Sequence, residues 1–269
     1  MRKAAYWILA VLITLAAAVF QRLTGPSYPV TGKAVLGGQT IAYHLERSAI
    51  SAENHKVRIT APDREVIGSL EWKRYPSDDL WTSRELEREG DTLVGSLPRL
   101  PRAGKMEYRV ILQKGAAVVS LSGPGSVILR YRGDVPAWLL VPHILVMFLG
   151  MLFSNRAGLA AIDGRERTKT LVFLTLILLF VGGFILGPIV QKYSFGVLWS
   201  GFPLGFDLTD NKTLIAFLAW IAAAVMVRKG KKGRWWVLGA AVVTLVIYLI
   251  PHSLLGSELK HAVRPKPGV

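Results

Sequence analysis

Residues 171–190 read LVFLTLILLFVGGFILGPIV, a stretch without a single charged side chain. A helix needs roughly 20 apolar residues to cross the roughly 30 Å hydrocarbon core of a bilayer. This stretch reaches that length, so it predicts a membrane-spanning helix. The composition agrees, because 51% of the 269 residues are hydrophobic, a high share for a soluble domain.

Four more uncharged runs bring the predicted membrane-spanning helices to five. They cover residues 4–20, 135–153, 213–227 and 235–252. The run 213–227 has only 15 residues, which at about 1.5 Å per residue reach about 22 Å. Its helix is therefore expected to begin earlier, near Leu208.

The first run follows a basic start, as the apolar part of a signal peptide does. Its small residues, Ala16 to Ala18, are followed by Val19 and Phe20 before the polar chain begins. This order is unlike a cleavage site, so we expect an uncleaved anchor helix.

The net charge of +15 is explained by where the basic residues lie. They gather at the start of the chain and in two short connections: Arg2 and Lys3; Arg156, Arg165, Arg167 and Lys169; Arg228, Lys229, Lys231, Lys232 and Arg234. Short cytoplasmic loops of membrane proteins are rich in Lys and Arg. The pattern predicts an N-terminus inside the cell and argues against a nucleic-acid partner.

The predicted fold is an α plus β membrane protein of the bacterial cytoplasmic (inner) membrane. Residues 1–23 form a transmembrane anchor, and residues 24–134 form an external, periplasmic domain. Residues 135–253 form a four-helix transmembrane bundle with an outer loop at 191–212, and residues 254–269 form a flexible external tail.

The external domain is predicted to be an all-β sandwich of about seven or eight strands. Apolar and polar residues alternate in 40–47, 56–60, 107–113 and 126–133, which is the period of a half-buried strand. The charge-dense segment 83–90 is expected to be a solvated edge or loop. A docking surface for a partner is the alternative.

The segment LPRAGKMEYRV, residues 100–110, resembles the immunoglobulin or fibronectin type III pattern. In that pattern Leu100, Gly104 and Tyr108 would take the places of a tyrosine corner. The resemblance covers about residues 28–134 and lacks the cysteine pair of antibody-type domains. It implies a fold and no activity.

The segment WSGFPLGFDLTDNK, residues 199–212, is the first candidate site. Asp207 or Thr209 suits the N-cap of the next helix, because a short side-chain oxygen can accept free backbone amides. The segment then forms an aromatic loop that leads into a capped helix. The alternative is a lid that binds a partner subunit or a cationic or hydroxylated ligand, since long connections often carry function. Its binding residues would be Trp199, Phe202, Phe206, Asp207, Asp210 and Lys212.

Two histidines form the second candidate site. His143 lies in the run 135–153, and His252 closes the run 235–252. Ionisable residues in membrane helices are rare and suggest function, so the pair could bind haem b axially or another metal. Each histidine follows a proline, so each could instead bond a carbonyl that the proline leaves free. With loop 199–212 they could share one pocket.

Enzyme motifs are missing, and the absence of cysteine excludes disulfides, thiolate metal sites and c-type haem. We therefore expect a non-catalytic subunit of an envelope complex, whose external domain and outer loop bind a partner protein or ligand. The alternative is a membrane redox subunit that binds haem b or a quinol near the outer face through His143 and His252. A transporter is the third and weakest interpretation, because the predicted helices contain few polar residues.

The topology can be tested with reporter fusions. A reporter fused after Gly230 should be cytoplasmic, because this position lies among the basic residues 228–234, and one fused after Val269 should be external. Reporter activity on the same side for both fusions would show that one of the five predicted spans is wrong.

Overall fold

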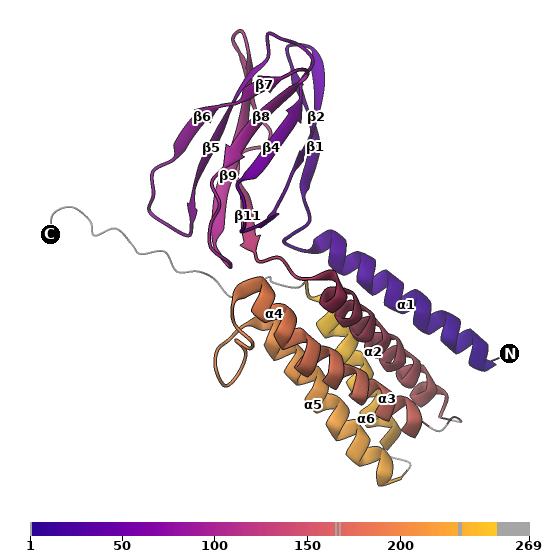
Figure 1. Cartoon of the computed structure of the whole chain (residues 1–269). Helices are drawn as coiled ribbons and strands as arrows, with labels where there is room; N and C mark the ends of the chain where they lie inside the picture. The colour runs from indigo at the N-terminus through magenta and orange to yellow at the C-terminus, as the bar shows by residue number, and fades with distance from the viewer. Residues whose placement is uncertain (1, 165, 167, 231–232, 252–269) are drawn as a thin grey trace. The chain divides into compact units, whose positions relative to one another are not determined.

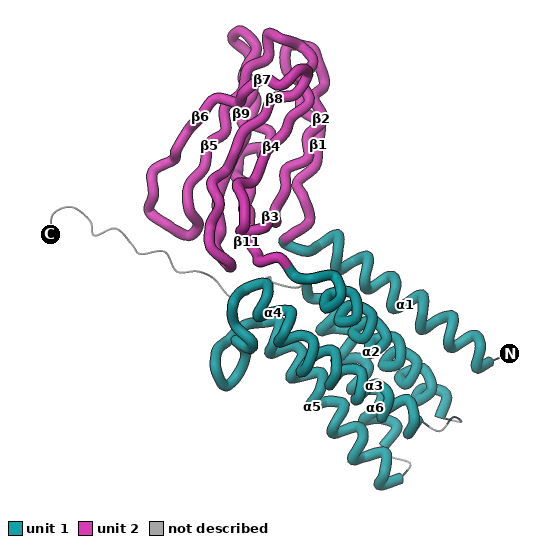
Figure 2. Tube along the Cα trace, viewed as in Figure 1, with its two compact units in different colours: residues 1–26, 135–257 teal, residues 27–134, 258–269 magenta. Residues whose placement is uncertain are grey.

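The computed structural model describes residues 2–164, 166, 168–230 and 233–251. The chain divides into two compact units, one helical and one built of β-strands, which Figure 2 colours teal and magenta. The β unit comprises residues 27–134, and the helical unit comprises the described residues on either side. The protein is therefore an α plus β protein.

The helical unit contains long apolar helices (Figure 1). They are α1 (Arg2–Thr24), α2 (Ala137–Asp163), α3 (Lys169–Phe180), the π-helical turn η1 (Val181–Leu186), α4 (Gly187–Phe195), α5 (Leu208–Arg228) and α6 (Gly233–Leu249). In the described residues, α1, α2, the continuous segment α3–η1–α4 and α5 are long and apolar enough to cross a membrane. The 17-residue helix α6 is apolar but shorter.

Four of these segments close into a bundle. Helix α2 packs against α3 and α6, α5 also packs against α3 and α6, and α1 lies outside against α2 and α6. Small residues let the helices approach closely; a Cβ at Gly158 would lie 2.8 Å from the Cβ of Ala241. The buried Trp220 indole of α5 donates a hydrogen bond to Thr244 Oγ1 of α6 at 2.8 Å.

Polar side chains attach α1 to the bundle. Asn155 Nδ2 in α2 donates to Thr14 Oγ1 at 3.0 Å, and Gln21 Nε2 donates to the Tyr248 carbonyl at 2.9 Å. In an apolar core such bonds satisfy groups that would otherwise be costly to bury. The first helix is thus packed on the bundle along its length.

The connection between α4 and α5 is shorter than the predicted outer loop 191–212. The helix that contains residues 171–190 continues to Phe195 and ends where Gly196 adopts a left-handed conformation, φ 88°. The next helix begins at Leu208, as expected from the short run 213–227, and Asp207 is its N-cap. The loop is therefore 196–207, because polar residues extend both helices beyond their apolar runs.

The β unit contains more strands than predicted. They are β1 (Val30–Leu36), β2 (Gln39–Leu45), β3 (Ser48–Ile50), β4 (His55–Thr60), β5 (Ile67–Tyr75), β6 (Thr82–Glu85), β7 (Glu87–Glu89), β8 (Thr92–Leu97), β9 (Lys105–Lys114), β10 (Ala117–Ser120) and β11 (Val127–Arg132). The strands form three sheets. The largest has the order β3-β11-β9-β5-β6, and β10 also pairs with β9 in it; the other two have the orders β4-β8-β7 and β1-β2. This arrangement is compatible with a β-sandwich.

The alternating segments form the expected strands, β2, β4, β9 and β11. Every second residue of β9 from Met106 to Leu112 is buried. The charged segment 83–90 supplies β6 and β7, each at the edge of its sheet. All four residues of β6 are exposed, as expected for a solvated edge. The unpredicted strands include β3 and β7, which are too short to show alternation.

The tyrosine corner predicted for Leu100, Gly104 and Tyr108 does not form. The Tyr108 hydroxyl donates to the carbonyl of Glu46 at 2.8 Å, far along the chain, whereas a tyrosine corner bonds a few residues upstream. A second buried tyrosine, Tyr131, donates to the Pro98 carbonyl at 2.8 Å. The likeness to immunoglobulin domains is therefore limited to a sandwich-like arrangement of strands.

We expect the Tyr108→Phe substitution to destabilise the β unit by about 1–3 kcal/mol, because it leaves the Glu46 carbonyl without its donor. Burial raises the pKa of the Tyr108 phenol, so the hydroxyl stays protonated and able to donate. The measurement is denaturant unfolding of residues 27–134 expressed alone, which should have the circular dichroism spectrum of a β protein. Tyr43→Phe is the control, because Tyr43 is only half-buried and packs at the margin of the core. Equal losses for the two variants would contradict the prediction.

Candidate functional site

The Asp210 carboxylate holds loop 196–207 in place. Asp210 lies in the first turn of α5 and is only 6% exposed. Its Oδ2 accepts the backbone amides of Ser200 at 2.6 Å and Gly201 at 3.0 Å. The same oxygen accepts the Ser200 hydroxyl at 3.2 Å and the Gln191 amide at 3.1 Å. One buried oxygen thus joins the loop to both flanking helices.

Further hydrogen bonds fix the rest of the loop. Asn211 Oδ1 accepts the Phe202 amide at 2.7 Å, and the Gly201 carbonyl accepts the amides of Leu204 and Gly205, both at 2.9 Å. A Cβ at Gly201 would lie 2.6 Å from the Asp210 Cβ, so only glycine allows this close approach. The loop therefore has a defined conformation supported by its own backbone.

The other two charged residues of the predicted site also contact backbone groups. The Asp207 side chain accepts the amides of Thr209 at 2.8 Å and Asp210 at 3.4 Å, which is the expected N-cap. Lys212 is 4% exposed, and its Nζ donates to the carbonyls of Ile250 at 2.8 Å and Pro251 at 3.3 Å. Lys212 therefore caps the end of α6, where orphan carbonyls attract a cation.

The aromatic residues of the predicted site divide into two groups. Trp199 turns inward: its ring stacks on Phe184 at 5.6 Å, and its Nε1 donates to the Phe202 carbonyl at 3.1 Å. Phe202, Leu204 and Phe206 are 64%, 77% and 90% exposed, and we call them the apolar tip. Leu204 was not among the predicted site residues, although its place between two phenylalanines was a usable signal.

His143 contacts the π-helical turn. Its Nδ1 lies 3.1 Å from the carbonyl of Gly182 in η1. A π-helical turn shifts the hydrogen-bond ladder and is often found at functional positions. The histidine does bond a carbonyl, as the structural alternative expected, but this carbonyl belongs to another helix and is not one freed by Pro142. His252 lies outside the described residues.

A small cavity brings two parts of the predicted site together. It measures 180 Å³, and its lining includes His143, Gln191, Asp207 and Asp210. Cavities that hold drug-sized ligands measure about 300–1,000 Å³, so this one suits a few waters or a very small molecule. A haem does not fit it. Within the described residues, no group of three or more His, Cys, Asp or Glu is placed to hold a metal.

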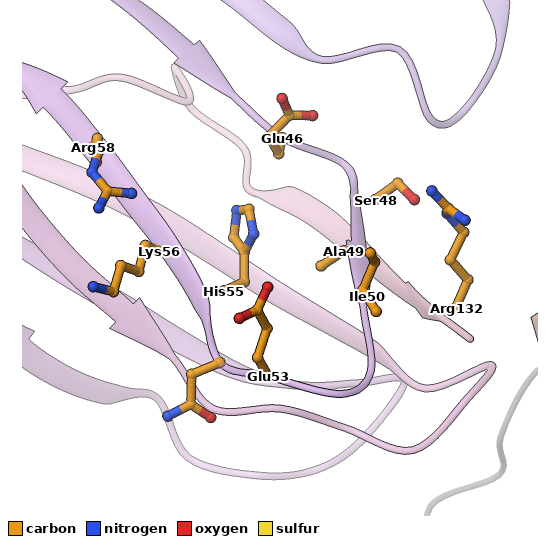
Figure 3. Close-up of a pocket in the computed structure, with 10 residues that line it drawn as sticks. Glu46, Ser48, Ala49, Ile50, Glu53, His55, Lys56, Arg58 and Arg132 are labelled. Carbon is orange, nitrogen blue, oxygen red and sulfur yellow. The ribbon is translucent and has the colours of Figure 1, made fainter. Parts of the chain in front are cut away.

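The β unit has a separate pocket that sequence reasoning missed. It measures 460 Å³ and lies at the end of β2 and the start of β4, with Glu46, Glu53, His55 and Arg132 in its lining (Figure 3). Burial lowers the pKa of His55, and the negative charge of Glu46 partly opposes this shift. The residues come from separate turns and strand ends, so no sequence motif marks the pocket. Its mixed charges define no reaction.

Scans of protein-family models, curated proteins and solved structures find no match to this chain.

We expect Asp210→Ala to destabilise loop 196–207 by about 1–3 kcal/mol, because it leaves buried amides without an acceptor. Hydrogen exchange of the full chain should then be faster at the amides of Ser200 and Gly201. Asp210→Asn is the matched control, because all four bonds go to one oxygen that the amide can still supply. Unchanged exchange in the alanine variant would show that Asp210 does not hold the loop.

Proposed function

We propose that this chain is a non-catalytic subunit of an envelope complex in the bacterial cytoplasmic membrane, and that the apolar tip binds a partner protein. The N-terminus is inside the cell, and the β unit and the C-terminus are outside. All five apolar helices span the bilayer. The apolar composition of the helices and the grouping of basic residues at the chain start and in the segments 154–170 and 228–234 support this topology.

The exposure of the apolar tip is the observation that supports this proposal. Exposed groups of large apolar side chains are uncommon in folded proteins and mark contacts with proteins or lipid. Here Phe202, Leu204 and Phe206 are exposed on a loop that the buried Asp210 carboxylate of α5 holds through the backbone amides of Ser200 and Gly201. A loop that is fixed before binding loses little conformational entropy when a partner docks.

The choice of side chains favours a protein partner over the lipid headgroups. Trp and Tyr are the residues enriched at membrane interfaces. In this loop the tryptophan, Trp199, has its indole bonded to the Phe202 carbonyl, while the most exposed large apolar side chains are those of Phe206 and Leu204. Side chains without polar atoms suit an apolar pocket on a partner. The β unit would then contribute further contacts on the same side of the membrane.

The redox alternative gains no support from the described residues. His143 already bonds the Gly182 carbonyl, and the adjoining cavity of 180 Å³ is small for a haem or a quinol.

Single-cysteine variants test the proposal, since the natural chain has no cysteine. Phe206→Cys should react quickly with a water-soluble maleimide when the purified protein is in nanodiscs. In native membranes the same cysteine should react several-fold more slowly, because the partner covers it. The measurement is the labelling rate in the two preparations.

Two control variants separate the outcomes. Leu80→Cys, 84% exposed in the β unit, should react quickly in both preparations, and Ile177→Cys, 56% exposed on α3, should react slowly in both because lipid covers it. Fast labelling of Phe206→Cys in both preparations would show that no partner covers the tip. Slow labelling in both would place the tip in lipid and also contradict the proposal.

A further inference from the structure

A large pocket lies at the other end of the helical bundle from loop 196–207. It measures 950 Å³ and lies where α2 and α5 end and α3 and α6 begin. Its lining includes Glu166, Lys169, Arg228, Arg234 and Trp235. We call it the basic pocket. None of the residues assigned to the proposed partner site lines it.

The basic pocket has uncompensated positive charge. In the part of the chain that the structure describes, Lys169, Arg228 and Arg234 form no ion pair. The two arginines contact aromatic rings: Arg228 lies 5.2 Å from the Phe173 ring centre, and Arg234 lies 4.8 Å from that of Trp235. Contact with a ring leaves the charge of a guanidinium unneutralised.

The acid in the basic pocket already has a partner. Glu166 Oε2 accepts a hydrogen bond from Arg156 Nη2 at 2.5 Å. Arg156 is only 2% exposed, and it lies against the rings of Tyr6 and Trp7 at 5.6 and 5.4 Å. Glu166 therefore balances the buried Arg156, and the three other cations remain available to an anion.

The backbone adds to the positive potential. Helix α3 begins at Lys169, beside the pocket, and α6 begins at Gly233, one residue before Arg234. The first amides of a helix have no partner within it, and the positive end of the helix dipole lies there. Two such ends beside three cations favour an anion that accepts several hydrogen bonds, as a phosphate does.

The walls of the basic pocket are partly apolar. Ala160, Val227 and Trp235 line it beside the cations, and the Trp235 side chain is exposed. A ligand with a phosphate group and an adjoining apolar portion would contact both kinds of wall. Basic pockets between membrane helices on the cytoplasmic side are suited to acidic lipid headgroups.

We propose that the basic pocket binds the phosphate group of an anionic phospholipid, with Lys169, Arg228 and Arg234 as its ligands. This inference rests on the membrane location proposed above, but not on the partner bound by the apolar tip. A soluble phosphate compound has the same binding group without the apolar portion, so the two sources can be distinguished.

Native mass spectrometry of the full chain in detergent tests the inference. The protein is mixed with equal amounts of phosphatidylglycerol and phosphatidylcholine, and bound lipid is counted. We expect phosphatidylglycerol to be retained preferentially. Each of Lys169→Gln, Arg228→Gln and Arg234→Gln should weaken its binding about fivefold, the effect of one lost charge near anionic lipid.

Lys229→Gln is the matched control, because Lys229 follows Arg228 directly but does not line the basic pocket. It should leave lipid retention unchanged. An equal loss in Lys229→Gln would show a general charge effect and overturn the inference, as would equal retention of the two lipids. If an arginine variant fails to fold, the Lys169→Gln variant alone is used to test the inference, since this exposed residue can change without disturbing the packing.

Competition with glycerol phosphate identifies the source of the phosphate. We expect phosphatidylglycerol to stay bound even in a large excess of glycerol phosphate. If glycerol phosphate displaces phosphatidylglycerol when the two are at equal concentration, the ligand is a soluble phosphate compound and the lipid assignment is overturned. A negative result here leaves the labelling of Phe206→Cys unaffected. If the chain is absent from the membrane fraction of the cell, both the partner proposal and the lipid proposal are contradicted.

Discussion

A single carboxylate oxygen, Asp210 Oδ2, organises the loop between α4 and α5. It accepts two backbone amides, a hydroxyl and a side-chain amide, and its residue is buried. A buried carboxylate without such donors would be very costly. The geometry of residues 199–201 therefore depends on the Asp210 carboxylate, which also links α5 to Gln191 of α4. The polar side chains around the apolar tip bond backbone groups, while the apolar tip itself is exposed.

Charged and polar side chains form hydrogen bonds with backbone groups at several other places in the chain. Asp207 caps the start of α5, and Lys212 bonds carbonyls at the end of α6. In the β unit, Tyr108 and Tyr131 bond carbonyls of distant segments. Buried backbone groups need partners. Asp207 supplies one locally, whereas Lys212, Tyr108 and Tyr131 supply theirs from far along the sequence. Much of the polarity that suggested ligand binding is used to complete the fold.

The two ends of the helical bundle differ in chemistry. At the loop end, the acids and the lysine contact backbone groups and apolar side chains face outward. At the basic end, Glu166 pairs with Arg156, and Lys169, Arg228 and Arg234 have aromatic or open surroundings. The first arrangement suits an apolar partner surface, and the second suits an anion. The distribution of charge within the bundle therefore separates two binding surfaces on one chain.

The sequence by itself determined the helices and many of the strands. Uncharged runs and alternating residues are local patterns, and local patterns report which face of an element is buried. The start of α5 was also predictable, because a 15-residue run is too short to span a bilayer. The sequence narrowed its N-cap to Asp207 or Thr209, and the structure shows Asp207. The sequence did not predict the end of α4, because polar residues at the end of a helix have the same composition as a loop. The partner of Tyr108 was missed because it lies on a distant segment.

Only the tertiary structure decided what the candidate residues do. The sequence grouped Trp199, Phe202, Phe206, Asp207, Asp210 and Lys212 as one binding set, and the fold separated the exposed Phe202 and Phe206 from the buried Asp210 and Lys212. It also brought His143 to the cavity shared with the two aspartates and gave Glu166 a buried partner in Arg156. The physical reason is that a charge already paired with an internal group attracts a ligand less strongly than an unpaired charge does. Whether a charge is paired depends on contacts between residues far apart in the chain.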